Sequence, residues 1–264
     1  MPRFTQVDAF TRQRFAGNPA AVIPLERWPD DAVLVAIAAE NNLSETAFLV
    51  AADGVAAEHE LRWFTPTCEV ALCGHATLAA GHVCLTEAPG REQVRFVTRQ
   101  SGVLTVGRAE DGYTLDLPAT EMELGAQPGL LAALGVETGK IFVARPPVRD
   151  TVIVLLEDEA AVRALTPDMA ALAKLGVMAI CTAPGAASDM VSRVFVPAWG
   201  VEEDPVTGSA HAALAPFWAG RLGRATLTAH QASARGGDLS CRVAGDRVIL
   251  TGQCVTVIEG VIHL

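Results

Sequence analysis

A sequence motif that occurs twice in the chain sets the strongest limit on its fold. The first copy runs from Arg62-Trp63-Phe64-Thr65-Pro66 into Cys73-Gly74-His75-Ala76-Thr77, and the second from Arg193-Val194-Phe195-Val196-Pro197 into Thr207-Gly208-Ser209-Ala210-His211. The arginines are 131 positions apart and the glycines 134, so the second copy holds three extra residues, in the stretch with Glu202-Glu203-Asp204-Pro205. This period is about half of the 264 residues. It predicts two similar half-chains, because a solenoid would need several shorter units.

Each copy predicts a strand followed by a helix. Proline cannot continue a ladder, so the strand ends there, and Gly74 or Gly208 then opens an alanine-rich run with good helix propensity. Such a helix N-terminus exposes backbone N–H groups and suits an anion, and two of them brought together by the duplication would hold a carboxylate. The alternative is a pair of packing helices whose glycines only permit close approach.

The remaining pattern predicts an α+β fold. Alternating strands and turns around one long alanine-rich helix recur in both halves, which predicts mostly antiparallel strands curling about a central helix. Pro118 ends the first half, so we expect an N-terminal half at 1–118, a linker near 119–127 and a C-terminal half at 119–254. The closing strand, 255–264, is left over from the second repeat and is expected to return to the first half.

Composition argues against two classes of protein, those that span a membrane and those that bind nucleic acid. Half of the residues are hydrophobic, which supports a sizeable core, and no apolar run reaches the ~20 residues that span a bilayer. The first residues lack the form of a signal peptide, so we expect a soluble cytoplasmic protein with no membrane partner. A net charge of −10 without a basic cluster makes nucleic acid a poor partner. The six cysteines form no C-x-x-C pair and are expected to be free thiols.

Candidate catalytic residues lie within or near the two copies of the repeated motif. Glu45 stands at the start of an apolar strand, where a carboxylate is costly to ionise unless it is paired and suits acid–base work. A solvated strand-end glutamate is the alternative. His75 follows Gly74 at the predicted helix mouth and could position or protonate a substrate, or simply bond to backbone. Cys73 at the same mouth is the one cysteine expected to be reactive.

Other motifs point away from cofactors. The sequence has no G-x-G-x-x-G, no P-loop and no G-x-S-x-G elbow around Ser209. Its six histidines have no metal-site spacing, so we expect neither a metal nor a cofactor. The acids Glu202-Glu203-Asp204 precede the second helix; most such acids cap helices, and one could be catalytic.

Four motifs in order resemble the phenazine biosynthesis PhzF-like family. They are Asn18-Pro19-Ala20-Ala21-Val22, Leu43-Ser44-Glu45-Thr46-Ala47-Phe48, Cys73-Gly74-His75-Ala76-Thr77 and Glu203-Asp204-Pro205-Val206-Thr207-Gly208-Ser209-Ala210. The resemblance implies the diaminopimelate epimerase fold, with two pseudo-symmetric halves that each wrap a barrel-like sheet around a central helix. It also implies a homodimer.

The resemblance assigns site residues and an activity. Glu45 takes the position of the family's acid/base, with His75, Asp204 and Ser209 at other active-site positions; Cys73, Gly74, Thr207 and Gly208 complete the two helix mouths as substrate-binding residues. The expected reaction is an isomerisation in which Glu45 moves a proton on a small carboxylate-bearing metabolite, without a cofactor. Racemases of this fold use two cysteines, and Cys73 has no partner thiol in the second copy of the motif. A thiol racemase or epimerase using Cys73, and a non-catalytic small-molecule-binding protein, are the alternatives.

Overall fold

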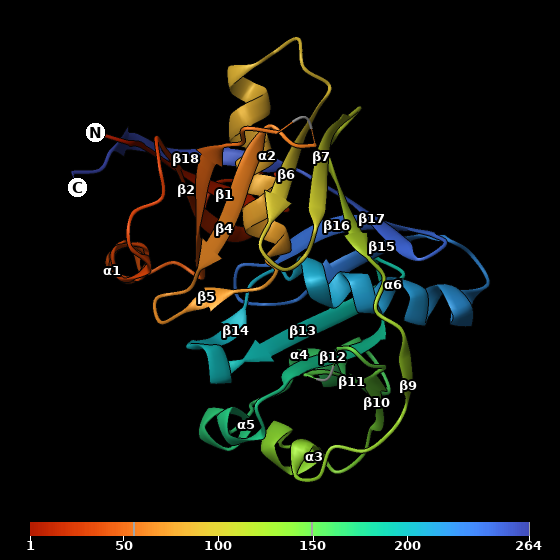
Figure 1. The fold of residues 1–264 in the computed structure, drawn as a ribbon. Coiled ribbons are helices and arrows are strands. Elements are labelled where there is room, and N and C mark those ends of the chain that lie inside the picture. Colours follow the sequence, from red (N-terminus) through yellow and green to blue (C-terminus); the bar gives the residue numbers. More distant parts are fainter. Residues whose placement is uncertain (55, 149, 264) are drawn as a thin grey trace. The chain divides into compact units, whose positions relative to one another are not determined.

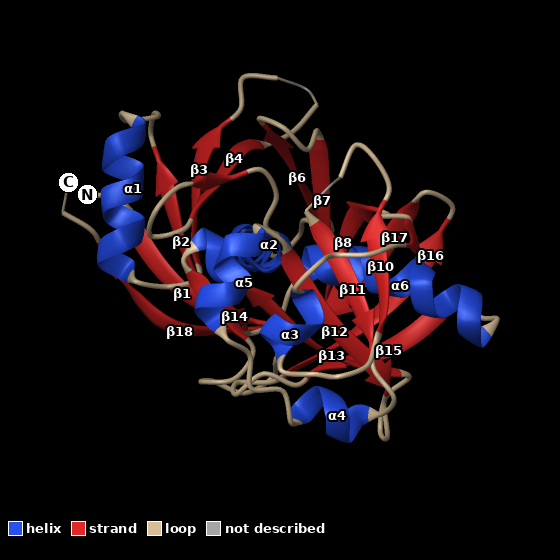
Figure 2. Ribbon diagram, turned by 90° about the horizontal axis from the view of Figure 1, so that it is seen from below, coloured by secondary structure: helices blue, strands red, loops and turns tan. Residues whose placement is uncertain are grey.

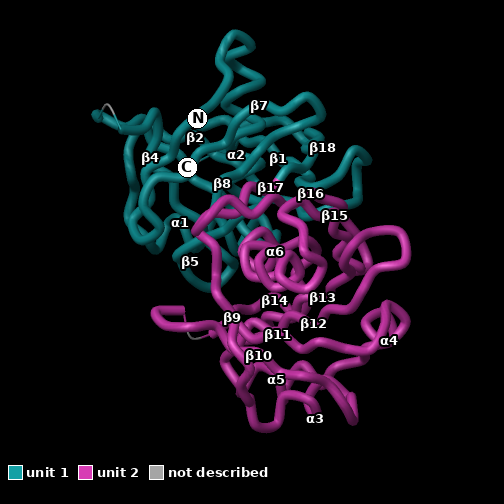
Figure 3. Tube along the Cα trace, turned by 90° about the vertical axis from the view of Figure 1, so that its right-hand side faces the viewer, with its two compact units in different colours: residues 1–117, 251–264 teal, residues 118–250 magenta. Residues whose placement is uncertain are grey.

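The chain folds into two compact units that each combine a large sheet with few helices. The computed structural model describes residues 1–54, 56–148 and 150–263 (Figure 1). The first unit contains residues 1–117 and 251–264, and the second contains residues 118–250 (Figure 3). Within the described residues, no helix combines the length and apolar character needed to span a membrane.

The first unit has a sheet of mixed direction around one helix. Its elements are β1 (Arg3–Ala9), β2 (Asn18–Leu25), α1 (Asp31–Asn41), β3 (Glu45–Ala51), β4 (His59–Phe64), β5 (Glu69–Val70), α2 (Gly74–Glu87), β6 (Gln93–Thr98), β7 (Val103–Ala109), β8 (Gly112–Pro118) and β18 (Cys254–Val261). The pairs β2–β3 and β4–β6 are parallel, and the other neighbours named for this unit are antiparallel. A parallel pair needs a crossover, which α1 and α2 supply.

Helix α2 lies inside the sheet of this unit. It packs against β1, β2, β3, β6 and β7, and Figure 2 shows these strands arranged around it. Its alanines and glycines are buried on all sides, as expected for a helix enclosed by a sheet rather than lying on its surface. The small side chains allow close approach: a Cβ at Gly81 would lie 2.3 Å from a methyl group of Val106 on β7.

The second unit repeats this order of strands. Its elements are β9 (Met122–Leu124), α3 (Leu130–Leu134), β10 (Lys140–Ala144), β11 (Thr151–Leu155), α4 (Glu159–Arg163), α5 (Met169–Leu175), β12 (Met178–Pro184), β13 (Met190–Val196), η1 (Pro197–Trp199), β14 (Val201–Asp204), α6 (Gly208–Leu222), β15 (Thr226–Gln231), β16 (Gly237–Ala244) and β17 (Arg247–Gly252). The parallel pairs are now β11–β12 and β13–β15. They correspond to β2–β3 and β4–β6, so the duplication seen in the sequence is a duplication of topology.

The repeated Arg-x-Phe builds the same clamp in both units. Arg62 donates Nε and Nη2 to the two carboxylate oxygens of Glu69, both at 2.7 Å, and Arg193 does the same to Glu203 at 2.8 and 2.9 Å. Each guanidinium lies 4.9 Å from the ring of the phenylalanine two residues later. A bidentate Arg–carboxylate pair fixes geometry strongly, so each clamp ties a strand to the short strand that leads into the glycine-led helix.

The clamps locate the three extra residues of the second copy. From the clamp glutamate to the helix glycine the spacing is the same, Glu69 to Gly74 and Glu203 to Gly208, whereas the spacing from arginine to glutamate differs. The insertion therefore lies in the β13–β14 hairpin, where η1 forms, and precedes Glu203.

Two elements differ in detail from the sequence-based expectation. The segment expected as a linker contains β9, which pairs with β10 through Met122 to Leu124. In the closing segment, expected as a strand over 255–264, the strand β18 runs from Cys254 to Val261 and pairs with β1. Leu264 lies outside the described residues.

Candidate active site

Glu45, His75 and Cys73 lie together in the first unit. Glu45 is the first residue of β3, Cys73 is the N-cap of α2, and His75 is the second residue of that helix. Glu45 Oε2 lies 3.3 Å from His75 Nε2, and Cys73 Sγ lies 3.4 Å from His75 Nδ1. The carboxylate is not solvated as a strand-end glutamate would be, since 16% of its side chain is exposed.

Asn18 fixes the tautomer of His75. Its Nδ2 lies 3.0 Å from His75 Nδ1. An amide nitrogen can only donate, so Nδ1 accepts and the ring proton resides on Nε2, toward the carboxylate of Glu45. Complete burial lowers the pKa of His75 to about 3, so the imidazole is neutral at physiological pH. The pair is thus a neutral N–H group 3.3 Å from a carboxylate oxygen, and among the described residues His75 Nε2 makes no hydrogen bond.

The same three side chains suit a cation poorly. Their donor atoms lie within 4.8 Å of one another, but the thiol faces Nδ1 and the carboxylate faces Nε2. The two nitrogens of one imidazole point in different directions and cannot both be directed at a single ion. The arrangement therefore fits proton handling better than metal binding.

Asp204 and Thr207 form a second cluster, in the second unit. Both side chains are 7% exposed, and Thr207 Oγ1 donates to Asp204 Oδ2 at 2.6 Å. Gln231, at the end of β15, joins them: its Oε1 accepts from the backbone N–H of Thr207 at 2.8 Å, and its Nε2 donates to the backbone oxygen of Asp204 at 2.6 Å. The acids before α6 thus have different roles, because Glu203 belongs to the arginine clamp and Glu202 is exposed.

The helices α2 and α6 begin alike. Gly74 and Gly208 are their first residues and are buried, and neither N-cap side chain, Cys73 or Thr207, caps a backbone N–H of its helix. Asp158 and Asp168 do cap α4 and α5, by accepting from Ala161 and Ala171. Buried first-turn N–H groups without a side-chain cap are available to an anion. Ser209, the second residue of α6, is half-buried.

The strand register shows which site residues the duplication did not copy. Phe48 lies opposite Arg62, and Cys181 lies opposite Arg193. Counting three residues back along each strand, Glu45 corresponds to Met178. The helix glycines align in the same way, so His75 corresponds to Ser209 and Cys73 to Thr207.

Counting on from the clamp glutamates, Asp204 corresponds to Val70. The acid–imidazole pair therefore belongs to the first unit alone, and the buried aspartate to the second.

Asn18 and Gln231 were not recognised as site residues from the sequence. Asn18 begins one of the four family-like motifs, which was a signal for its importance but not for its contact with His75. Gln231 stands in no motif, and only the pairing of β15 with β13 brings it to the start of α6.

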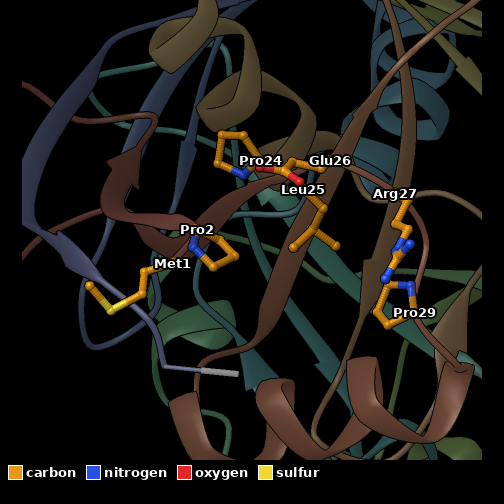
Figure 4. Close-up of a pocket in the computed structure, with 7 residues that line it drawn as sticks. All are labelled: Met1, Pro2, Pro24, Leu25, Glu26, Arg27 and Pro29. Atoms are coloured by element: carbon orange, nitrogen blue, oxygen red, sulfur yellow. The ribbon is translucent and has the colours of Figure 1, made fainter.

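A surface hollow of about 280 Å³ lies elsewhere in the first unit (Figure 4). Met1, Pro2, residues 24–27 and Pro29 line it. It contains none of the residues of the Glu45–His75 cluster, so we do not assign the chemistry to it.

The fold is shared with a solved epimerase structure. A hydroxyproline epimerase from Agrobacterium vitis superimposes with a TM-score of 0.60 over 98% of this chain and 91% of its own, at 11% identity. At that identity the likeness concerns the fold alone, and it defines the class as the epimerase-type α+β fold.

The chain belongs to the phenazine biosynthesis-like (PhzC-PhzF) protein family, whose model matches residues 7–260. It is 51% identical over 272 residues to an uncharacterized isomerase of Pseudomonas aeruginosa, covering 99% of this chain and 98% of that protein. A PhzF family protein of Enterococcus faecalis has a TM-score of 0.88 and 43% identity over 100% of this chain and 99% of its own.

Proposed function

We propose that this protein is an isomerase that moves a proton between two positions of a small carboxylate-bearing metabolite, with Glu45 as the acid/base. One observation carries the proposal: a part-buried carboxylate faces the N–H of a buried neutral histidine, and the equivalent positions of the second unit hold Met178 and Ser209. Relatives named as isomerases support the class of reaction.

A single base favours a proton shift over a two-base racemisation. Racemisation by two bases needs a group on each face of the carbon, as the two-cysteine racemases of the fold have. The residue equivalent to Cys73 is Thr207, whose hydroxyl already donates to Asp204. One carboxylate can instead take a proton from a carbon next to a conjugated system and return it to another carbon, so the atoms balance without any co-reactant.

The surrounding groups have supporting roles in this proposal. His75 Nε2, which carries the ring proton, lies 3.3 Å from Glu45 Oε2 without a hydrogen bond between the two, so it can donate to developing negative charge, and Asn18 keeps it in that tautomer. The uncapped first turns that start at Gly74 and Gly208 supply N–H donors for carboxylate groups. Asp204, Thr207 and Ser209 remain predicted substrate-handling residues, and the homodimer remains a prediction as well.

Deuterium uptake tests the proposal. The protein is incubated in heavy water with a panel of small unsaturated carboxylates, and proton NMR follows exchange at each carbon. A substrate should gain deuterium at one carbon. Glu45→Gln keeps the shape but removes the base, so exchange should fall by at least ~10²-fold. Glu40→Gln, the same change at an exposed position on α1, should leave it unchanged.

The controls separate the alternatives. Exchange by Glu45→Gln at the wild-type rate would contradict the role of Glu45. Carboxylates that raise the melting temperature of the wild type without any exchange would instead identify a binding protein.

A further inference from the structure

A row of three buried polar side chains crosses the sheet of the second unit, and two of the three equivalent positions in the first unit are apolar. Thr182, Ser192 and Gln231 lie opposite one another on β12, β13 and β15, and all are at most 1% exposed. The positions equivalent to Thr182 and Ser192 are Leu49 and Leu61, which are paired in the same way on β3 and β4.

The first unit shows that the fold does not require this polar row. Two leucines fill the equivalent places on β3 and β4, and the residue opposite Leu61 is Thr98, which bonds to Gly102 within its own hairpin. Burying polar groups costs free energy unless they are hydrogen-bonded. Thr182 and Gln231 are hydrogen-bonded, Thr182 to Val191 and Trp218, so of the three only the Ser192 hydroxyl has no hydrogen-bond partner among the described residues. The polar row therefore differs from the first unit in what its hydrogen bonds hold in place.

The contacts of Gln231 show what its hydrogen bonds hold in place. Its side chain bonds to the turn between the clamp strand β14 and helix α6, through the backbone N–H of Thr207 and the backbone oxygen of Asp204. One of these groups can only donate and the other can only accept, so they fix which end of the amide is oxygen. The same Nε2 also lies 3.1 Å from Thr207 Oγ1.

The orientation of the Gln231 amide determines to which acceptor each hydrogen-bonding proton of the cluster is donated. Because the amide N–H donates to Thr207 Oγ1, the hydroxyl proton of Thr207 is left for Asp204 Oδ2, 2.6 Å away. In the first unit the equivalents of Asp204, Thr207 and Gln231 are Val70, Cys73 and Thr98, so the whole relay is missing there. A serine that donates to the backbone oxygen of the first residue after the short strand is present in both units, as Ser101 to Ala71 and Ser233 to Pro205. This shared bond belongs to the fold, and the relay does not.

We propose that Gln231 is a positioning residue of the active site, which holds the Asp204 carboxylate in place through Thr207. The assignment of Asp204 to the active site rests on the proposed function; the relay itself does not. The experiment therefore has one arm without substrate and one with it.

The first arm measures amide hydrogen exchange by NMR in Gln231→Leu, with Ser192→Ala as the matched control. Ser192 is the neighbour of Gln231 in the polar row, and its hydroxyl has no hydrogen-bond partner among the described residues. In Gln231→Leu the Thr207 amide loses its acceptor, so its exchange should accelerate at least ~10-fold relative to core amides such as Val194. Ser192→Ala should leave that ratio unchanged. An unchanged Thr207 amide, or equal acceleration of all amides, would overturn the proposal.

The second arm uses a carboxylate of the panel that the wild type exchanges. Gln231→Glu keeps the acceptor for Thr207 N–H, but an ionised carboxylate cannot donate to Thr207 Oγ1, so turnover should fall at least ~10-fold at pH 8. The introduced carboxyl group donates again once it is protonated, so lowering the pH should restore much of the rate relative to the wild type. Gln231→Leu should show no such recovery. Equal loss at every pH in both variants would make Gln231 a structural residue only.

The two arms test different claims: hydrogen exchange tests the relay, and turnover tests its role in the proposed function. If no carboxylate is turned over, the proposed function fails while the hydrogen-exchange arm still decides whether the relay orders the turn. If Glu45→Gln abolishes turnover but both Gln231 variants behave as wild type, the proposed function stands and the positioning role is wrong.

Discussion

The protonation state of one imidazole governs the chemistry available to the first unit. His75 is neutral because it is buried, and its proton resides on Nε2 because Asn18 donates to Nδ1. Neither fact can be read from the motif Cys73-Gly74-His75. The sequence predicted that His75 stands at a helix mouth, but the tautomer depends on a residue 57 positions earlier in the chain.

We therefore expect Asn18→Asp to impair turnover. An aspartate accepts from Nδ1–H, which moves the ring proton away from Glu45 and leaves a lone pair facing its carboxylate. Exchange of the panel carboxylate should fall by ~10-fold or more. Nitrogen-15 NMR of His75 should show the proton on Nε2 in the wild type and on Nδ1 in the variant. The wild-type tautomer in Asn18→Asp would contradict this account.

Cys73→Ser distinguishes the carboxylate route from the thiol route. The thiol is 5% exposed and contacts His75 Nδ1, but the equivalent position in the second unit is Thr207. A hydroxyl can occupy the same place, so turnover should fall by less than ~10-fold. A loss of several orders of magnitude, with Glu45→Gln nearly active, would restore a thiol mechanism.

At the scale of elements, the repeated motif predicted in both halves a strand that ends near a proline and a helix that begins at a glycine. It did not reveal the carboxylate partner of each arginine. Glu69 and Glu203 stand at different distances from Arg62 and Arg193, because the second hairpin contains three more residues. A side-chain clamp across a hairpin depends on the length of its turn, which the motif alone does not fix.

The enclosed position of α2 predicts opposite effects of the same substitution in two helices. Alanine favours a helix over glycine by up to ~1 kcal/mol. Gly220 in α6 has no atom within 4 Å of an added Cβ, so Gly220→Ala should raise the free energy of unfolding by about that amount. At Gly81 the added Cβ meets Val106 at 2.3 Å, and a β-branched side chain on a strand cannot turn away cheaply.

Gly81→Ala should therefore lower the free energy of unfolding by about 1–3 kcal/mol, the range for overpacking. Chemical denaturation of both variants measures the difference. A stabilised Gly81→Ala would mean that β7 has room to move from α2.

For the molecule as a whole, the repeat predicted a duplicated α+β fold, and the resemblance of four motifs identified the family. The expectation of mostly antiparallel strands did not identify the parallel pairs β2–β3 and β4–β6 or their counterparts. Local alternation of apolar residues shows that a strand exists but not which distant strand lies beside it. Gln231 was missed for the same reason, since its role arises from the pairing of β13 with β15.

Two buried histidines, one in each unit, predict how stability depends on pH. Burial lowers the pKa of His75 to about 3 and that of His211 to about 4. The ordinary value near 6.5 applies to the unfolded chain, so below pH 6.5 the unfolded state binds protons that the folded state does not. Each histidine thus contributes stability that is fully present above pH 6.5 and is lost as the pH falls toward its folded pKa.

The loss should be measurable between pH 6.5 and 5. Each histidine should account for a loss of about 2 kcal/mol in the free energy of unfolding over this window, at 1.36 kcal/mol per pH unit. Burial also lowers the pKa of His59 and His82, which adds in the same direction, so the comparison needs variants. Urea denaturation of the wild type should show a steep decline, and His75→Asn and His211→Asn should each flatten it. The carboxylates with lowered pKa, such as Glu58 and Glu159, titrate below this window. A decline of equal slope in both variants and the wild type would show that these imidazoles can be protonated without unfolding.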